Sequence, residues 1–347
     1  MYLEVAIGGI KHTRLILARD IASIERDEID SAADAAMGGN GERTPGREAV
    51  SSNATRVAFL TLEGSVGSEI HTSALEEAVA LLEDDDVDIL VLRMNSGGGS
   101  AEMANVSEFI QDEIKPEYRV VGWVESAISA AAFIMFTLED MYMMSEGNIG
   151  GAVGFSQQGG RAKALEGEGL EWSLRFGETV SRRGNRDPRI MRAMQVFMTL
   201  SCDIDAAGNV TWYDDNSGRY IVSRENQILT LNSQDAVRYG VARAIADTRE
   251  ELMEALGVRE WVEVGQDANA HMRSYREAVA TAQVRINELL QKMQIALEAG
   301  QGSRARRFLG EIRSWVNRAP ALEDSMGLTP DWFREQERRI DEMTRSG

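Results

Sequence analysis

The spacing of hydrophobic residues changes repeatedly between positions 56 and 257 of this 347-residue chain. Continuous apolar runs occur at 56–64, 87–95, 118–124 and 140–145, and the segments between them carry apolar residues three or four positions apart. The first pattern is typical of buried strands and the second of amphipathic helices. Strands that alternate with helices predict an α/β fold with parallel strands and right-handed crossovers.

Local signals predict further elements. Ser73 is a candidate N-cap for a helix over 73–85, because its hydroxyl can accept a hydrogen bond from the first helical turn. Residues 209–223 hold two short runs of strand-forming residues around a polar turn, which predicts a hairpin. Cys202 is expected to be a buried helix residue without a catalytic role.

Composition divides the chain into three parts. Residues 1–55 are predicted to be an N-terminal arm and flexible linker, because positions 30–55 are small, polar and rich in glycine. Residues 56–257 form the predicted α/β domain. Residues 258–347 are predicted to be a helical appendage that begins with a long amphipathic helix from about 268 to 298.

The charge and the few metal-binding residues exclude several function classes. A net charge of −19 argues against nucleic acid or an anionic membrane as the main partner. Neither a metal nor a cofactor is expected, since the chain has one cysteine and three widely separated histidines, and it has no Walker A motif. No stretch is apolar enough to cross a bilayer. These features favour a soluble cytoplasmic protein over a periplasmic one with a cleaved leader.

Two features that suit catalysis follow neighbouring strands. Gly97–Gly99 come directly after the strand at 87–95, and Ser129 comes shortly after the strand at 118–124. The carboxyl ends of parallel strands lie at one edge of a sheet, so the glycine turn and Ser129 are expected to face each other. Exposed amides in a glycine turn can hold an oxyanion, and a serine beside them supplies half of an acyl-transfer site.

Three segments carry a resemblance to a known family: "VLRMNSGGGSAEMANVSEFIQ", "VVGWVESAISAAAFIMFTLEDMYMMSEGNIGGAVG" and "LTLNSQDAVRYGVARAIADTREELMEALG". In this order they resemble the Clp-fold serine peptidases, in the branch of signal peptide peptidase A and the NfeD-type membrane-protein proteases. The resemblance covers roughly residues 56–257. It implies a ClpP/crotonase-like spiral of ββα units, to which the predicted C-terminal all-helical appendage is added.

The resemblance also implies roles for individual residues. Ser129 matches the nucleophile of the family. The oxyanion hole would be formed by the backbone amides of Gly98 or Gly99 and of Ala130. Gly97 stands where the family usually has proline, which leaves the turn more flexible.

The general base is harder to place. The Clp protease uses a histidine, but the only histidine after Ser129 is His271, in the predicted appendage. The signal-peptide-peptidase branch uses a lysine, and Lys163 is the only lysine between Ser129 and residue 257. A lysine acts as a base only when its surroundings lower its pKa toward neutrality.

The leading hypothesis is an ATP-independent serine endopeptidase that cleaves peptides, unfolded proteins or membrane-derived segments through a dyad of Ser129 and Lys163. One alternative is a catalytically inactive scaffold of the same fold, whose long helices bind partners. Another is a crotonase-type acyl-CoA enzyme with Glu125 as the catalytic carboxylate. Because relatives in the resembled family generally assemble, we expect a homo-oligomer.

Overall fold

The computed structural model of this chain describes residues 2–7, 10–15, 54–158 and 161–346. The chain divides into two units, residues 1–49 and 50–347. In the first unit, strands β1 (Tyr2–Ile7) and β2 (Ile10–Leu15) pair as an antiparallel hairpin. The predicted linker at 30–55 lies outside the described residues except at its last two positions.

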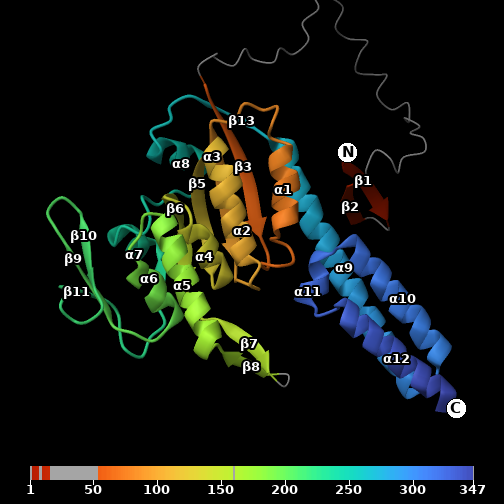
Figure 1. The fold of residues 1–347 in the computed structure, drawn as a ribbon. Helices are drawn as coiled ribbons and strands as arrows, with labels where there is room; N and C mark the ends of the chain where they lie inside the picture. Colours follow the sequence, from red (N-terminus) through yellow and green to blue (C-terminus); the bar gives the residue numbers. More distant parts are fainter. Residues whose placement is uncertain (1, 8–9, 16–53, 159–160, 347) are drawn as a thin grey trace, which may run out of the picture. The chain divides into compact units, whose positions relative to one another are not determined.

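A six-stranded, mostly parallel sheet forms the centre of the second unit (Figure 1). Its strands are β3 (Thr55–Glu63), β4 (Ile89–Ser96), β5 (Arg119–Ile128), β6 (Asp140–Gly150), β12 (Thr230–Asn232) and β13 (Trp261–Val264). The order across the sheet is β12-β6-β5-β4-β3-β13. All neighbours are parallel except β12, which pairs antiparallel with β6. The predicted α/β architecture with parallel strands is confirmed.

Apolar residues from both faces of the sheet are buried, which explains the continuous runs in the sequence. One face forms the larger core with α1 (Thr72–Ala80), α2 (Met103–Phe109) and α4 (Ala130–Phe136). The helix at α2 continues as a π-helical turn, η3 (Ile110–Ile114), and then as α3 (Lys115–Glu117). The other face forms a smaller core with α8 (Arg249–Ala255).

The prediction for the start of α1 was wrong by two residues. The N-cap is His71, whose Nδ1 atom accepts a hydrogen bond from the Ser73 amide at 3.2 Å. An imidazole nitrogen takes the part that a serine oxygen usually plays, so the helix begins at Thr72 instead of after Ser73.

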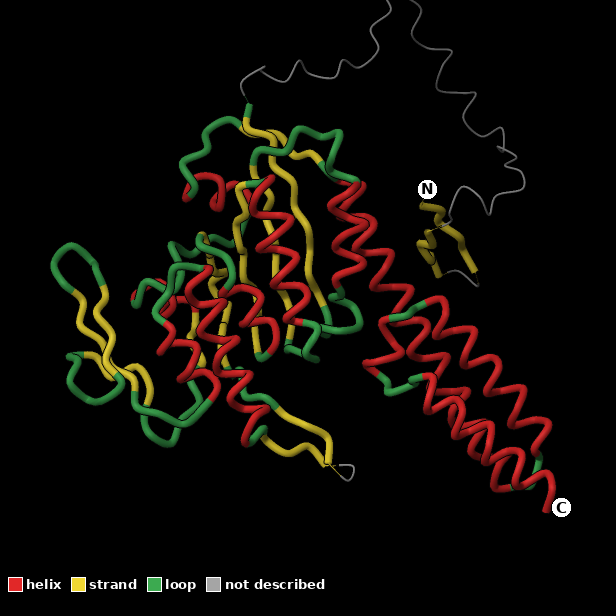
Figure 2. Tube along the Cα trace, viewed as in Figure 1, coloured by secondary structure: helices red, strands yellow, loops and turns green. Residues whose placement is uncertain are grey.

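The predicted hairpin at 209–223 was also wrong. Strands β10 (Val210–Tyr213) and β11 (Tyr220–Ser223) each pair antiparallel with β9 (Leu200–Ile204), which lies between them (Figure 2). Cys202 is therefore a residue of the central strand, not of a helix, although its predicted burial is confirmed. Residues 205–209 form a second polar turn, which joins β9 to β10, and there the Gly208 amide donates to the Asp205 carbonyl at 3.0 Å.

Most of the remaining elements of the α/β part lie between β6 and β12 in the sequence. Strands β7 (Phe155–Gln158) and β8 (Arg161–Ala164) form an antiparallel hairpin. It is followed by α5 (Gly167–Arg183) and α6 (Pro188–Gln195), and α7 (Ser233–Arg238) follows β12. Helix α5 packs against α4 and α6, so this segment adjoins the carboxyl edge of β5.

Four helices end the chain: α9 (Gln266–Glu298), α10 (Gly302–Arg318), α11 (Ala321–Ser325) and α12 (Pro330–Ser346). The first turns of α9 belong to the core of the α/β part, where Ala268 and Met272 are fully buried. The rest of α9 packs against α10, α11 and α12 around a separate apolar core (Figure 1). The predicted apolar stripe of the long helix is covered mainly by the helices that follow it.

Candidate active site

Ser129 lies at a sharp turn from strand to helix. Strand β5 ends at Ile128 and α4 begins at Ala130, so Ser129 is the only residue between the two elements. Its backbone adopts φ 57° and ψ −122°, a combination that is uncommon for any residue but glycine. Backbone strain of this kind is found preferentially at functional sites, and strand-to-helix turns of this type present nucleophilic serines in other folds.

The glycine turn after β4 lies directly against Ser129. A Cβ atom placed on Gly98 would lie 2.5 Å from Ser129 Cβ and 3.0 Å from Ser129 Oγ. Gly98 also has φ +106°, which residues with side chains rarely adopt. Only glycine therefore fits at this position, and the expected meeting of the two strand ends is present in the structure.

Some backbone amides around Ser129 already donate a hydrogen bond and others do not. The Gly98 amide donates to Ser96 Oγ at 3.1 Å, and the Ser129 amide donates to the Gly150 carbonyl at 2.9 Å. Within the described part of the chain, the Gly99 and Ala130 amides have no acceptor. Of the amides predicted to hold an oxyanion, these two remain free to donate.

The two serines at the start of the alanine-rich segment have different surroundings. Ser126 lies within β5 and its Oγ hydrogen-bonds Asn148 Oδ1 at 3.1 Å. Ser129 Oγ has no hydrogen-bond partner among residues 54–158 and 161–346. The alanines that follow Ser129 are buried in α4, where their small size lets the helix pack closely below the turn. Ser129 is therefore the hydroxyl that remains available for chemistry.

A cavity of about 170 Å³ opens beside Ser129. Ser100, Ser129 and Ser173 are its polar side chains, and Gly99 and Ala130 also line it. Its apolar lining comes from Met103, Phe133, Phe155, Leu165 and Trp172. The Trp172 ring stacks on Phe176, which stacks on Phe133, with centroid distances of 5.4 and 5.7 Å. A concave apolar site with a few polar groups at one end is the usual form of a small ligand site.

The sequence reasoning missed the apolar lining contributed by Phe155, Leu165 and Trp172. Phe155 is 63% exposed and Trp172 is 43% exposed, which is unusual for rings of this size. Their only signal in the sequence is that they flank the glycine-rich segment after "NIGGAVG". The sequence predicts Lys163 of this segment as the general base, but it does not predict that the apolar neighbours of Lys163 line the site.

Lys163 does not hydrogen-bond Ser129 in this structure. It lies on β8, and its Nζ atom pairs with Glu166 Oε2 at 2.9 Å. Both side chains are mostly exposed, at 52% and 72%. Lys163 is not among the residues that line the cavity, but Leu165, two positions later, is one of them. Lys163 thus lies on the β7–β8 hairpin, two positions before a residue that lines the cavity, and its amine forms an ion pair with Glu166.

Other predicted or alternative groups lie elsewhere. Lys115 Nζ donates to the carbonyl oxygens of Thr137 and Arg183, which occupy it away from Ser129. Glu125 Oε2 pairs with Arg93 Nη2 at 2.6 Å and does not line the cavity. The crotonase-type hypothesis therefore has no free carboxylate at this site from the residue predicted to supply it.

Two further observations limit the chemistry. Burial and the adjacent Asp203 raise the pKa of the Cys202 thiol to about 11, so this thiol stays protonated at neutral pH. In the part of the chain that the structure describes, no group of three or more His, Cys, Asp and Glu residues is arranged to hold a metal ion. No helix described here is both long and apolar enough to span a membrane.

Comparison with known families identifies the α/β part. Residues 57–266 match the family model described as NfeD1b, N-terminal domain. The chain belongs to this family. Its resemblance to NfeD-type proteins, predicted from the sequence, is thus confirmed.

The membrane protein NfeD1b of Bacillus subtilis (strain 168) is 27% identical to this chain over 187 residues. The match covers 53% of this chain and 38% of the Bacillus protein, so most of the length of the Bacillus protein lies outside the match.

Solved structures also resemble this member of the NfeD1b family. A serine-to-alanine variant of the 1510-N membrane-bound stomatin-specific protease has a TM-score of 0.45 and 16% identity, covering 58% of this chain and 84% of that one. The 1510-N membrane protease specific for a stomatin homolog from Pyrococcus horikoshii has a TM-score of 0.40 and 16% identity, with 58% and 78% covered. At these TM-scores the likeness assigns no role to any residue of this chain.

Proposed function

We propose that this NfeD1b-family chain is an ATP-independent serine endopeptidase with Ser129 as its nucleophile. The observation that carries the proposal is the unpartnered Ser129 hydroxyl, held in a strained turn against Gly98 and flanked by the free amides of Gly99 and Ala130. Nucleophile and oxyanion donors at one point are the parts that acyl transfer requires. We also propose that the α/β part has the ClpP/crotonase-like spiral of ββα units that the family resemblance implies.

In the proposed mechanism Lys163 is the general base. Its amine must first be released from Glu166 and lose its proton. Neutral Nζ then takes the proton from Ser129 Oγ as Oγ attacks the scissile carbonyl carbon. The Gly99 and Ala130 amides hold the resulting oxyanion. The tetrahedral intermediate collapses with cleavage of the C–N bond, Lys163 returns the proton to the leaving amine, and water hydrolyses the acyl-enzyme.

The cavity suggests which substrates fit. Its apolar lining favours a peptide with a large apolar side chain next to the scissile bond. Such residues are buried in folded proteins, so unfolded or membrane-derived segments are the proposed substrates. The exposed rings of Phe155 and Trp172 would contact such a side chain at the mouth of the cavity.

Hydrolysis of an unfolded protein tests the proposal. Wild-type protein should degrade casein without ATP, and Ser129→Ala should reduce the rate to background. Ser126→Ala is the matched control, because Ser126 is three residues away and its hydroxyl is bound to Asn148. Equal loss in both variants, or full activity in Ser129→Ala, would contradict the assignment.

The second candidate is an inactive scaffold. The Lys163–Glu166 ion pair favours it, since a charged lysine cannot accept a proton. If the protein is an inactive scaffold, the wild type should not hydrolyse casein at any pH. Ser129→Ala should then bind every protein that the wild type binds.

Assembly and location remain proposals as well. We propose a homo-oligomer, for which the large exposed side chains of Val284 and Ile295 on α9 provide apolar contact area. Light scattering should give a mass above that of one chain, and Val284→Glu with Ile295→Glu should lower it; a wild-type monomer would exclude the proposal. A cytoplasmic location also stays a prediction.

A further inference from the structure

A second cavity, of about 570 Å³, lies at the opposite edge of the sheet from Ser129. It is lined by the end of α5, the start of α6, strand β10 and the segment after α7. That segment is fixed to the first residues of β6, because the Arg243 amide donates to the Met141 carbonyl at 2.7 Å. Ser129 follows the carboxyl end of the neighbouring parallel strand β5, so the two cavities are separate and share no lining residue.

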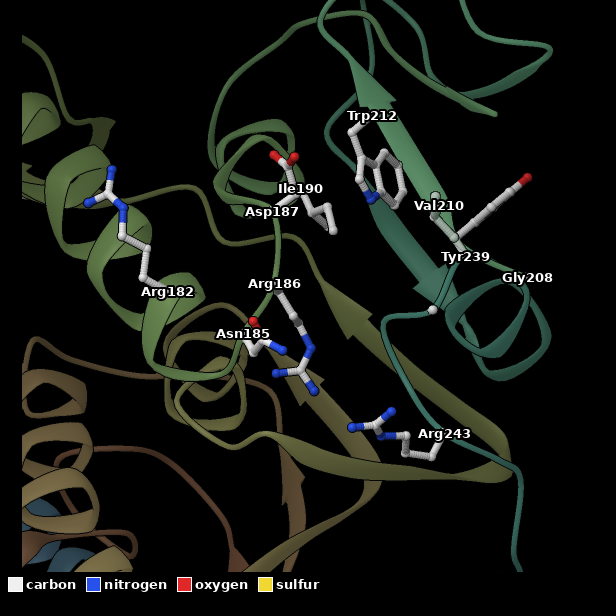
Figure 3. Close-up of a pocket in the computed structure, with 11 residues that line it drawn as sticks. Arg182, Asn185, Arg186, Asp187, Ile190, Gly208, Val210, Trp212, Tyr239 and Arg243 are labelled. Carbon is white, nitrogen blue, oxygen red and sulfur yellow. The ribbon is translucent and has the colours of Figure 1, made fainter. Parts of the chain in front are cut away.

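Two guanidinium groups face each other in this cavity. Figure 3 shows the side chains of Arg186 and Arg243 directed toward each other, from the α5–α6 turn and from the segment after α7. Arg186 is held in place by backbone carbonyls: Nε donates to Val241 at 2.9 Å, Nη1 to Leu138 and to Gly184 at 3.1 Å, and Nη2 to Glu139 at 3.4 Å. Its position is therefore fixed before any ligand arrives.

The positive charge here is only partly neutralised. Within the described residues, Arg186 forms no ion pair with a carboxylate. Arg243 Nε lies 3.3 Å from Asp140 Oδ1, but Asp140 also pairs with Arg119 at 3.5 Å. Burial, and then the charge of Arg243, lower the pKa of Arg186 to about 10. The charges of Asp140 and Glu139 act in the opposite direction on Arg186, but Asp140 is shared between Arg243 and Arg119, and Glu139 pairs with Lys115.

The one carboxylate among the lining residues does not correct this imbalance. Asp187 is bound to Arg189, with Oδ2 2.7 Å from Nη2, and Oδ1 accepts from the Arg189 amide at 2.9 Å to cap α6. An arginine pair without its own counter-ion is unexpected in a chain with a net charge of −19. A bound anion would relieve the repulsion.

The opposite side of the cavity is apolar. Ile190, Val210, Trp212 and Tyr239 line it, and the rings of Trp212 and Tyr239 meet edge to face at 6.1 Å. The cavity volume falls within the range of small organic ligands and exceeds what a bare ion needs. A ligand with one anionic group and a compact apolar body matches both sides.

We propose that this cavity binds a small phosphate monoester, with the phosphate between Arg186 and Arg243 and the organic part against the wall formed by Trp212 and Tyr239. Arg243 suits phosphate because the Nη atoms of its guanidinium can donate two parallel hydrogen bonds to phosphate oxygens, while Arg186 adds a second positive charge and its remaining Nη2 hydrogen. The site is independent of peptide hydrolysis at Ser129, and its ligand can be tested whether or not the protein is a peptidase.

Isothermal titration calorimetry with phenyl phosphate on the full chain, at constant ionic strength, tests this site. The expected result is one binding site per chain, with affinity reduced at least tenfold in Arg243→Gln. Arg243 is 63% exposed, so this variant should keep its fold. Arg175→Gln is the matched control, since Arg175 is an exposed arginine on α5 that does not line the cavity.

Each other outcome overturns the proposal. It fails if wild-type protein does not bind phenyl phosphate at millimolar concentration, or if Arg243→Gln binds as well as wild type. Equal weakening in Arg175→Gln would show general charge attraction instead of a site. Tighter binding of benzoate than of phenyl phosphate would contradict the assignment of a phosphate group.

Discussion

The backbone of Gly98 and the side chain of Ser129 are in such close contact that a methyl group on Gly98 would lie 2.5 Å from Ser129 Cβ. Gly97, one residue earlier, faces open space, and a methyl group there would have no neighbouring atom within 4 Å. Adjacent glycines of one turn therefore have opposite tolerance for a side chain, although the sequence "SGGGS" does not distinguish them.

Replacing these two glycines separately tests whether the turn positions the serine. Gly98→Ala must move either the turn or Ser129, and displacing an oxyanion donor costs about 100-fold or more in rate. We expect at least that loss of casein hydrolysis, with a lower melting temperature because Gly98 has φ +106°. Gly97→Ala should keep most of the casein hydrolysis and most of the thermal stability of the wild type. Similar activity in the two variants would show that contact with Gly98 is not needed.

The ion pair between Lys163 and Glu166 gives a second prediction. Glu166→Gln removes the ion-pair partner of the Lys163 amine, so the amine is free to reach Ser129 and the rate of casein hydrolysis should rise. Lys163→Ala and Lys163→Arg should both be inactive, since a guanidinium cannot serve as the base. The pH dependence of casein hydrolysis measures all three. An unchanged profile in Lys163→Ala would exclude Lys163 as the base.

Glu102 makes stability depend on pH. The Thr72 amide and hydroxyl donate to its carboxylate at 3.0 and 2.6 Å, and Asn105 donates at 2.7 Å. Burial alone would raise the pKa of Glu102, but these hydrogen bonds and the nearby His71 lower it below its ordinary value of 4.5. The folded state therefore gains stability above pH 4.5, and this gain is lost as the pH falls through the lower folded pKa.

Glu102→Gln should accordingly lower the free energy of unfolding at pH 7 by about 1 kcal/mol. The difference from wild type should shrink as the pH falls below 4.5. Urea unfolding at pH 7 and at pH 4 measures both values. A difference that is equal at the two pH values would show that the charged form of Glu102 is not what stabilises the protein.

The long helix α9 is joined to the sheet through Asn269. Its Oδ1 atom accepts a hydrogen bond from the Thr61 amide of β3 at 3.0 Å. Asn269→Ala leaves that amide without a partner, so we expect unfolding free energy to fall by about 1–3 kcal/mol. Asn287→Ala, an exposed position on the same helix, should change it little. If urea unfolding finds equal effects, the contact with β3 does not stabilise this junction.

The sequence predicted strands β3 to β6, because buried parallel strands leave a continuous apolar pattern, as in "VDILVLRMN" before the glycine turn that follows β4. Strand β13 was missed: it pairs with β3 in the sheet, although residues 258–347 were predicted to be a helical appendage. The sequence also placed Ser129 near Gly98, because consecutive parallel strands end at the same edge. Pairing between short strands was not predictable. Strands β10 and β11 flank a polar turn, yet both pair with β9, because another polar turn at 205–209 joins β9 to β10 and local pattern does not rank the two turns.

The same limit applies to the sites. The alanine-rich stretch after Ser129 could be recognised, but nothing in it tells that Ser126 is bound to Asn148 while Ser129 is free. Likewise, Arg186 and Arg243 are 57 positions apart (243 − 186) and come together only in the folded chain. Local patterns predict elements, whereas side chains that meet across elements depend on the three-dimensional fold.

Labelling with a fluorophosphonate probe, followed by peptide mapping, tests the central claim most directly, because this reagent reacts with serines that are activated as nucleophiles. Wild-type protein should be labelled at Ser129, Ser126→Ala should be labelled to the same extent, and Gly98→Ala should lose most of the label. Absence of label on Ser129 in folded wild-type protein, at neutral and at alkaline pH, would contradict the proposed peptidase and favour the inactive scaffold.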